Sequence, residues 1–202
     1  MILISLPIFF IAVVIHEYAH GWVAYKLGDP TAKYAGRLTL NPLAHIDMMG
    51  TIVLPLLLIM MRSPFIFGWA KPVPINFALL RRPRQDIFWV SIAGIAANLL
   101  LAVFLAFLLR IRLFPLNSYG WLFLNYGIII NLVLAVFNAI PIPPLDGSKI
   151  LLRFLPTDLA RSYLQLERFG FLILIILLWM GLLRKIIWPL VITLARSLGV
   201  SF

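Results

Sequence analysis

Two histidines and one glutamate stand inside an apolar stretch near the start of the chain, where ionisable side chains are costly. His16 and His20 are four residues apart, so on a helix they share one face within reach of a single cation. Glu17 is offset by about 100° around the helix axis, which leaves it near such an ion without making it a ligand. This His-Glu-x-x-His spacing predicts a zinc site in which Glu17 takes a proton from a zinc-activated water.

Other interpretations of these residues stay open at this point. His16 and His20 could be buried hydrogen-bonding residues with a coincidental spacing, although the cost of ionisable groups in an apolar helix disfavours coincidence. They could instead form a metal or proton pathway in a membrane transporter, but the sequence shows no internal repeat of the kind transporters use. A catalytically inactive binding module is the third alternative, and Glu17 disfavours it because no structural need explains a glutamate there.

A hydrolytic zinc site needs a third protein ligand and an open position. The chain has no cysteine, so the candidates are histidine, aspartate and glutamate. Asp146 follows a long apolar run and three prolines that end a helix near membrane depth, and we favour it, although it could also cap a helix over residues 147–155. His45 lies in a polar loop, where a hydrogen-bonding role is the simpler interpretation. We therefore expect one zinc ion per chain, on His16, His20 and Asp146.

The composition is typical of a membrane protein. Of the 202 residues, 63% are apolar and only 12% are charged, and the mean hydropathy is +1.04. So few charged side chains cannot cover a folded globule, which excludes a soluble domain. The net charge of +10 is expected on loops at an anionic lipid leaflet, so the predicted partner is the bilayer and not nucleic acid.

We predict an α-helical polytopic membrane protein with about five transmembrane helices, at the apolar runs 1–27, 87–109, 119–140, 169–183 and 186–198. The shorter run 51–61 contains Pro55 and is predicted to be re-entrant, with a hairpin before the second crossing. A sixth crossing at that run is the alternative. The whole chain, 1–202, is predicted to be one domain, with a core over about 8–155 and a C-terminal helical hairpin over about 157–200.

The predicted crossings put residues 26–86 and 141–168 on one side of the membrane together with the C-terminus. That side carries 13 of the 17 Lys and Arg residues, and the other four are Arg110, Arg112, Arg184 and Lys185. An excess of basic residues marks the cytoplasmic side. We therefore expect a multi-pass cell-membrane protein whose site lies near the cytoplasmic side.

Several segments together resemble one family, the site-2 proteases, which are intramembrane zinc metalloproteases. Residues 16–20 resemble its zinc motif, and residues 138–147 resemble its second signature, Asn-x-x-Pro-x-Pro-x-Leu-Asp-Gly. Residues 93–98 are similar to its Gly-Pro-x-x-Asn segment, with Ile95 in place of the proline, which bears on the local helix geometry. Three more segments resemble the compact prokaryotic branch without PDZ or CBS domains, namely residues 28–32, 36–42 and 68–76.

The resemblance implies that Asp146 is the third zinc ligand. It also implies a transmembrane protein as the substrate and a prokaryotic plasma membrane as the location. The natural substrate and the oligomeric state are not indicated by the sequence.

A transmembrane helix must unwind before it can be cut, because its carbonyls are engaged in helical hydrogen bonds. The stretch 65–77 could offer an extended edge to the unwound substrate, since its prolines enforce extended backbone around Val73 and Ile75. A membrane-dipping loop is the alternative. Asn98 could bond that edge or the substrate backbone, or simply join two helices. The candidate substrate-binding residues are Val73, Pro74, Ile75, Asn98 and Asn138.

Overall fold

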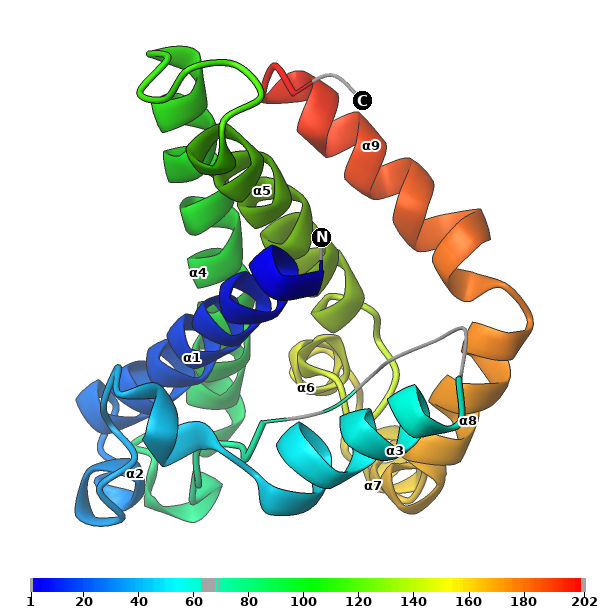
Figure 1. Ribbon diagram of the computed structural model, residues 1–202. Coiled ribbons are helices and arrows are strands. Elements are labelled where there is room, and N and C mark those ends of the chain that lie inside the picture. Colours follow the sequence, from blue (N-terminus) through cyan, green and yellow to red (C-terminus); the bar gives the residue numbers. More distant parts are fainter. Residues whose placement is uncertain (1, 63–67, 69, 201–202) are drawn as a thin grey trace.

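The computed structural model describes residues 2–62, 68 and 70–200, and its regular structure is helical, with no strand among these residues (Figure 1). An all-helical fold was predicted. In chain order the elements are α1 (Ile2–Lys26), α2 (Thr31–Tyr34), η1 (Pro42–His45), η2 (Met48–Val53), α3 (Leu54–Met60), η3 (Phe77–Leu79), α4 (Pro83–Arg110), α5 (Tyr119–Asn138), α6 (Asp146–Leu152), α7 (Thr157–Leu164), α8 (Glu167–Trp179), η4 (Leu183–Ile187) and α9 (Trp188–Ser197).

Three of the described helices, α1, α4 and α5, are long and apolar enough to cross a membrane, and they match the first three predicted long runs. Helix α4 begins at Pro83, whose fixed φ and missing N–H suit the first helical position. The Asp86 carboxylate accepts the Arg82 N–H at 2.7 Å and so satisfies a donor that precedes the helix. Helix α5 begins after Ser118, whose Oγ accepts the Trp121 N–H at 3.2 Å. Local signals therefore set where these helices start.

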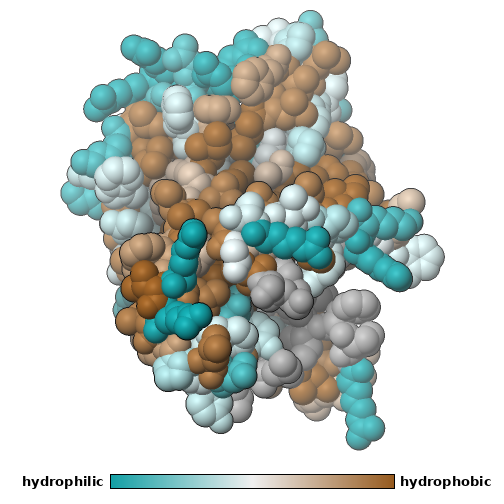
Figure 2. Space-filling view, turned by 90° about the horizontal axis from the view of Figure 1, so that it is seen from above, coloured by the Kyte–Doolittle hydropathy of each residue, from teal (hydrophilic) through white to brown (hydrophobic). Residues whose placement is uncertain are grey.

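The three long helices pack against one another and form the body that carries the site (Figure 1). Buried apolar residues of α4 and α5 make the main core together with α9. Large apolar side chains also cover the outward faces, and Leu100 of α4 is 70% exposed. Brown apolar residues take up much of the face seen in Figure 2, between separate hydrophilic side chains. An outward apolar surface of this extent is typical of a protein that lies in lipid.

The C-terminal part differs from the predicted hairpin. Helix α8 has 13 residues and α9 has 10, and at about 1.5 Å per residue neither alone covers about 30 Å of hydrocarbon. Figure 1 shows α8 and α9 following each other along one bent path, so that the C-terminal end of α9 lies near the loop between α4 and α5. The chain does not reverse at Arg184 and Lys185, which lie within the π-helical turn η4. The described residues thus contain three candidate spans, or up to four if α7 and α8, bent by 66°, form one.

The region between α1 and α4 contains the run that was predicted to be re-entrant. There η2 and α3 form a short apolar helical stretch over Met48–Met60, below the length of a full crossing. Within the predicted edge over 65–77, residues 65–67 and 69 lie outside the described residues. From residue 70 to residue 76 the chain has no regular secondary structure, so the predicted hairpin has no strand in its described part.

Gly170 lies where α8 passes the turn that precedes α6, and a Cβ added there would be 2.3 Å from the Pro143 carbonyl oxygen. Because backbone cannot move aside cheaply, Gly170→Ala is expected to destabilise the protein by about 2 kcal/mol or more. The control is Gly36→Ala, where φ is +65° and no atom lies within 4 Å, so only about 1 kcal/mol of backbone strain is expected. Thermal unfolding in detergent measures both. An equal or smaller loss for Gly170→Ala would contradict the packing of α8 on that turn.

Candidate metal centre

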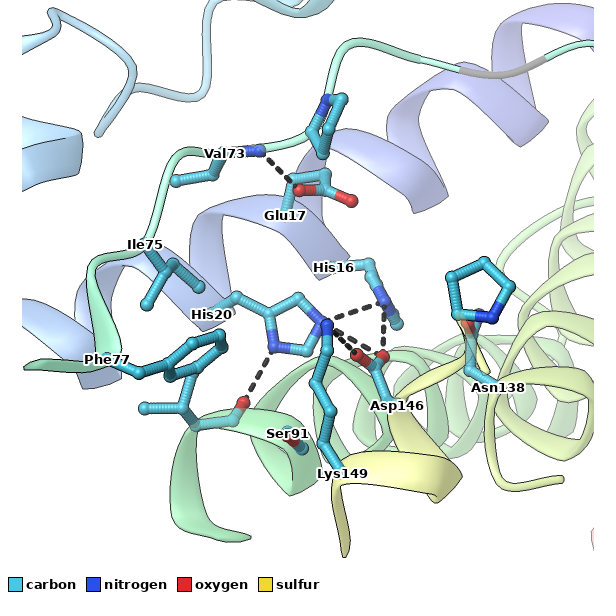
Figure 3. A pocket seen from close by; sticks show the side chains of 13 residues that line it. His16, Glu17, His20, Val73, Ile75, Phe77, Ser91, Asn138, Asp146 and Lys149 are labelled. Atoms are coloured by element: carbon cyan, nitrogen blue, oxygen red, sulfur yellow. Dashed lines mark hydrogen bonds and ion pairs between the residues drawn. The ribbon is translucent and has the colours of Figure 1, made fainter. Parts of the chain in front are cut away.

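Three ligand-type side chains from distant parts of the sequence meet at one point (Figure 3). The Nε2 atoms of His16 and His20 are 3.0 Å apart, and the Asp146 Oδ2 atom lies 3.1 Å from the first and 3.0 Å from the second. All three residues are buried. The imidazoles come from successive turns of α1, whereas the aspartate comes from the first turn of α6. The N-cap of α6 is Leu145, so the Asp146 carboxylate faces the imidazoles and does not cap the helix.

Helix α4 supplies the groups that orient both imidazoles. The His16 Nδ1–H donates to Asn98 Oδ1 at 2.6 Å, and the His20 Nδ1–H donates to the Val90 carbonyl at 2.7 Å. The Asn98 amide is itself fixed, since its Nδ2 donates to Asn131 Oδ1 at 2.8 Å. Protons on both Nδ1 atoms leave the Nε2 lone pairs directed toward each other and toward the carboxylate.

This donor set fits a zinc ion. Two nitrogen lone pairs and a carboxylate oxygen at these separations repel one another unless a cation lies between them. Tetrahedral ligands about 2.0–2.2 Å from zinc are roughly 3.3–3.5 Å apart, close to the separations here. Burial alone would raise the pKa of Asp146, but when an Nε2 atom of His16 or His20 carries a proton in place of the metal, its hydrogen bond to the carboxylate lowers that pKa below its usual range. Asp146 is therefore an anion at neutral pH.

Gly94 gives the imidazoles their space on the side of α4. A Cβ added at Gly94 would lie 2.4 Å from His20 Nε2 and 2.7 Å from His16 Nε2. Only a glycine at this position lets α4 approach the cluster so closely. The segment 93–98 therefore contributes both the space beside the imidazoles and the Asn98 amide that orients one of them. Ile95, which stands where the family motif has proline, lies within an unbroken α4.

Glu17 lies beside the cluster on the wall of a cavity of about 180 Å³. Its Oε2 accepts the Val73 N–H at 2.7 Å, so the loop that follows α3 holds one oxygen of the carboxylate (Figure 3). The cavity is large enough to hold several water molecules. The residues that line it are His16, Glu17, His20, Pro72, Val73, Ile75, Phe77, Val90, Ser91, Asn138, Pro144, Asp146 and Lys149.

The predicted substrate-binding residues fall in different places. Val73, Ile75 and Asn138 line the cavity, and Pro74 does not. Asn98 has the second of the roles considered for it and joins helices, because it is fully buried and its side chain bonds His16 of α1 and Asn131 of α5.

His45, the other candidate ligand, is also fully buried and lies outside the ligand cluster. Its Nε2–H donates to the Thr39 carbonyl at 2.9 Å. This is the hydrogen-bonding role that its loop position suggested.

Two residues near the site were not singled out from the sequence. Lys149 lines the cavity with its Nζ 3.9 Å from Asp146 Oδ1, and its spacing of three residues from Asp146 on one helix could have indicated it. Asn131 bonds the Asn98 amide. An asparagine within the apolar run of α5 could have indicated it, because polar side chains in such runs often bond between helices.

Comparison with known proteins agrees with this donor set. A model of peptidase family M50 matches residues 115–181. YwhC of Bacillus subtilis, named as a zinc metalloprotease, is 40% identical over 186 residues, which cover 87% of this chain and 80% of YwhC. Rip2 of Mycolicibacterium smegmatis, also named as a zinc metalloprotease, is 33% identical over 93% of this chain and 71% of Rip2. No solved structure matches the chain.

These similarities identify the chain as a zinc metalloprotease, and its body consists of helices of the membrane-spanning type. The chain belongs to peptidase family M50 and is a compact site-2 protease. The resemblance drawn from the sequence motifs is therefore confirmed, and so is zinc as the cofactor.

Gly94→Ala should reduce zinc binding strongly, because the added methyl would occupy the space of both Nε2 atoms. We expect at least a 100-fold loss of zinc affinity, comparable to the upper range for disturbed groups around a metal. The control is Gly36→Ala, where no atom lies within 4 Å of the added Cβ, so its zinc content should stay at the wild-type level. Metal analysis of purified protein measures both. Full zinc content in Gly94→Ala would place the ion away from α4.

Proposed function

We propose that this zinc metalloprotease cuts peptide bonds in or near the transmembrane segments of other membrane proteins. His16, His20 and Asp146 hold its zinc ion, and Glu17 is the general base. The observation that carries the proposal is the meeting of three ligand atoms within 3.1 Å, inside an apolar helical body and on the same cavity as Glu17. A protease with its reactive groups buried among apolar helices is suited to a substrate that also lies in lipid.

The chemistry follows from where these groups lie. Zinc held by these residues supplies a Lewis acid that polarises the scissile carbonyl and acidifies the attacking water. The Glu17 carboxylate takes the proton of that water and passes it to the leaving amine. The Val73 N–H, by bonding Oε2, fixes the carboxylate and leaves Oε1 for proton transfer. Asn98 acts through His16, which it orients by the bond to Nδ1, and is not proposed to touch the substrate.

The substrate must present an unwound backbone, and the extended residues 70–76 are the proposed place where it binds. The Ile75 N–H and the Val73 carbonyl have no hydrogen-bond partner among the residues that the structure describes. Free backbone groups on an extended stretch can pair with a second extended chain. Asn138 at the end of α5 also lines the cavity and is a further proposed contact.

The transporter alternative is not favoured. The relatives that match most of this chain are named as zinc metalloproteases.

Glu17→Gln should abolish cleavage of a tagged single-span substrate, because an amide cannot accept the proton of the water. The loss expected is at least about 100-fold in kcat. Zinc content and thermal stability should stay at the wild-type level, since Glu17 is not a ligand. Asp146→Ala is the matched variant, and it should lose zinc as well as activity. Retained activity in Glu17→Gln would remove Glu17 from the mechanism, and lost zinc would make it a ligand.

We also propose that the metal centre lies near the cytoplasmic side of the membrane and that the chain forms a single domain. The C-terminal end of α1, the N-terminal end of α4 and α6 lie at the same end of the bundle (Figure 1). The segments 26–86 and 141–168 at that end contain 12 of the 17 Lys and Arg residues. Of the remaining five, Arg110, Arg112 and Arg196 lie toward the other end. Arg184 and Lys185 lie between the two ends, at the bend between α8 and α9. Such a bias is typical of a cytoplasmic face.

Single cysteines test this placement, because the chain has no cysteine of its own. Lys33→Cys should react with a membrane-impermeant thiol reagent only after the cytoplasmic side is opened, and Leu116→Cys should react from outside. Ser197→Cys should behave like Leu116→Cys if α9 ends near the α4–α5 loop. Labelling of Ser197→Cys together with Lys33→Cys would instead restore the C-terminal hairpin. Labelling of Lys33→Cys from outside would reverse the orientation.

A further inference from the structure

The segments that follow α1 match motifs of the compact site-2 proteases, yet the catalytic chemistry uses none of their polar side chains. One of these side chains is Arg37. Its Nη2 donates to the Lys71 carbonyl at 2.6 Å and to the Pro72 carbonyl at 3.3 Å. The Lys71 N–H in turn donates to the His45 carbonyl at 2.9 Å. The start of the stretch 71–76 is therefore held by the Arg37 guanidinium and by the backbone carbonyl of the buried His45.

The end of the same stretch is held by an anion. Asp29 is fully buried, and its Oδ2 accepts the Asn76 N–H at 2.7 Å. Its other oxygen accepts the Thr31 N–H at 2.9 Å and the Thr31 hydroxyl. A buried carboxylate that accepts three hydrogen bonds is held rigidly, and hydrogen bonds to charged groups are about twice as strong as neutral ones. The two ends of 71–76 are thus fixed by opposite charges from one connecting region.

Between these two anchors lies the backbone that faces the reaction. The Val73 N–H holds Glu17, and Ile75 has an N–H that no group of the described chain accepts. Residues two apart on an extended strand direct their backbone groups to the same side. Since Pro74 has no N–H and the Val73 donor is already engaged, Ile75 is the donor left for a substrate. The stretch therefore fixes the general base and offers a pairing position two residues away.

We propose that Asp29 and Arg37 are positioning residues that set the register of the substrate against Glu17. They do so by holding the stretch 71–76 at both ends, so that a substrate strand paired at Ile75 presents one particular peptide bond to the base. The inference rests on the proposed function. Loss of either anchor lets the stretch shift along α1, and displacements of about 1 Å are enough to cost about 100-fold in rate.

The experiment uses the full-length, zinc-loaded protein and a tagged single-span test protein that the wild type cleaves, with the products identified by mass spectrometry. In Arg37→Gln and Asp29→Asn we expect wild-type zinc content, at least a tenfold lower kcat/KM, and cleavage spread over neighbouring peptide bonds. Arg37→Lys should lie between Arg37→Gln and the wild type, since an ammonium can still donate to one carbonyl. The control is Lys33→Gln, whose exposed side chain contacts Tyr25 and not the stretch.

The spread of cleavage positions separates positioning from a purely structural role, because a partly unfolded enzyme cuts more slowly at the same bond. Cleavage at the single wild-type bond in both variants, at any rate, would overturn the proposal. Loss of zinc in parallel with activity would also overturn it, since the anchors would then support the metal centre. If Asp29→Asn does not fold, the two Arg37 variants decide. If the wild type cleaves none of the single-span proteins screened as test proteins, the proposed function is refuted instead.

Discussion

A carboxylate and two imidazoles must lie against one another inside an apolar helix bundle, and the surrounding structure is shaped by this requirement. Asp146 is 126 residues from His20 in the sequence, and its Oδ2 lies 3.0 Å from the His20 Nε2. Prolines after α5 stop that helix and return the chain as α6, whose first turn carries the aspartate. Gly94 removes the side chain that would otherwise fill the contact between α4 and both imidazoles.

Polar groups at this depth are stable only where their hydrogen bonds are complete, which explains the amides on α4 and α5. An unpaired amide in such surroundings costs several kcal/mol, on the order of 2–7 depending on the reference state. The Asn98 oxygen accepts from His16, and its nitrogen donates to the Ala12 carbonyl and to Asn131. Asn131 in turn donates to the Gly127 carbonyl. The network begins at a proposed zinc ligand and ends on the backbone of a third helix, so the ring orientation of His16 depends on the packing of all three.

The loops after α1 supply the polar contacts to an extended backbone that the apolar helices cannot supply. A bundle of Leu, Ile and Phe side chains can bury a metal centre but offers an extended chain nothing to bind. Arg37 and Asp29 lie in polar segments at the end of the bundle and bond the backbone of residues 71–76. The Val73 N–H that reaches Glu17 belongs to this stretch, so the loops and the metal centre meet at a single carboxylate.

The spacing of His16, Glu17 and His20 was enough to predict a metal site, because helical periodicity is a local property that these five consecutive positions define. The long apolar runs located α1, α4 and α5 for the same reason. The position of Asp146 after the prolines favoured it as the third ligand, and the family resemblance supported that choice, whereas the partner of Asn98 could not be read from either. The path of α8 and α9 was also mispredicted from the pair Arg184 and Lys185, since a charged pair does not tell whether a chain reverses. Those features depend on contacts between residues that are distant in the chain, and packing alone decides which of them meet.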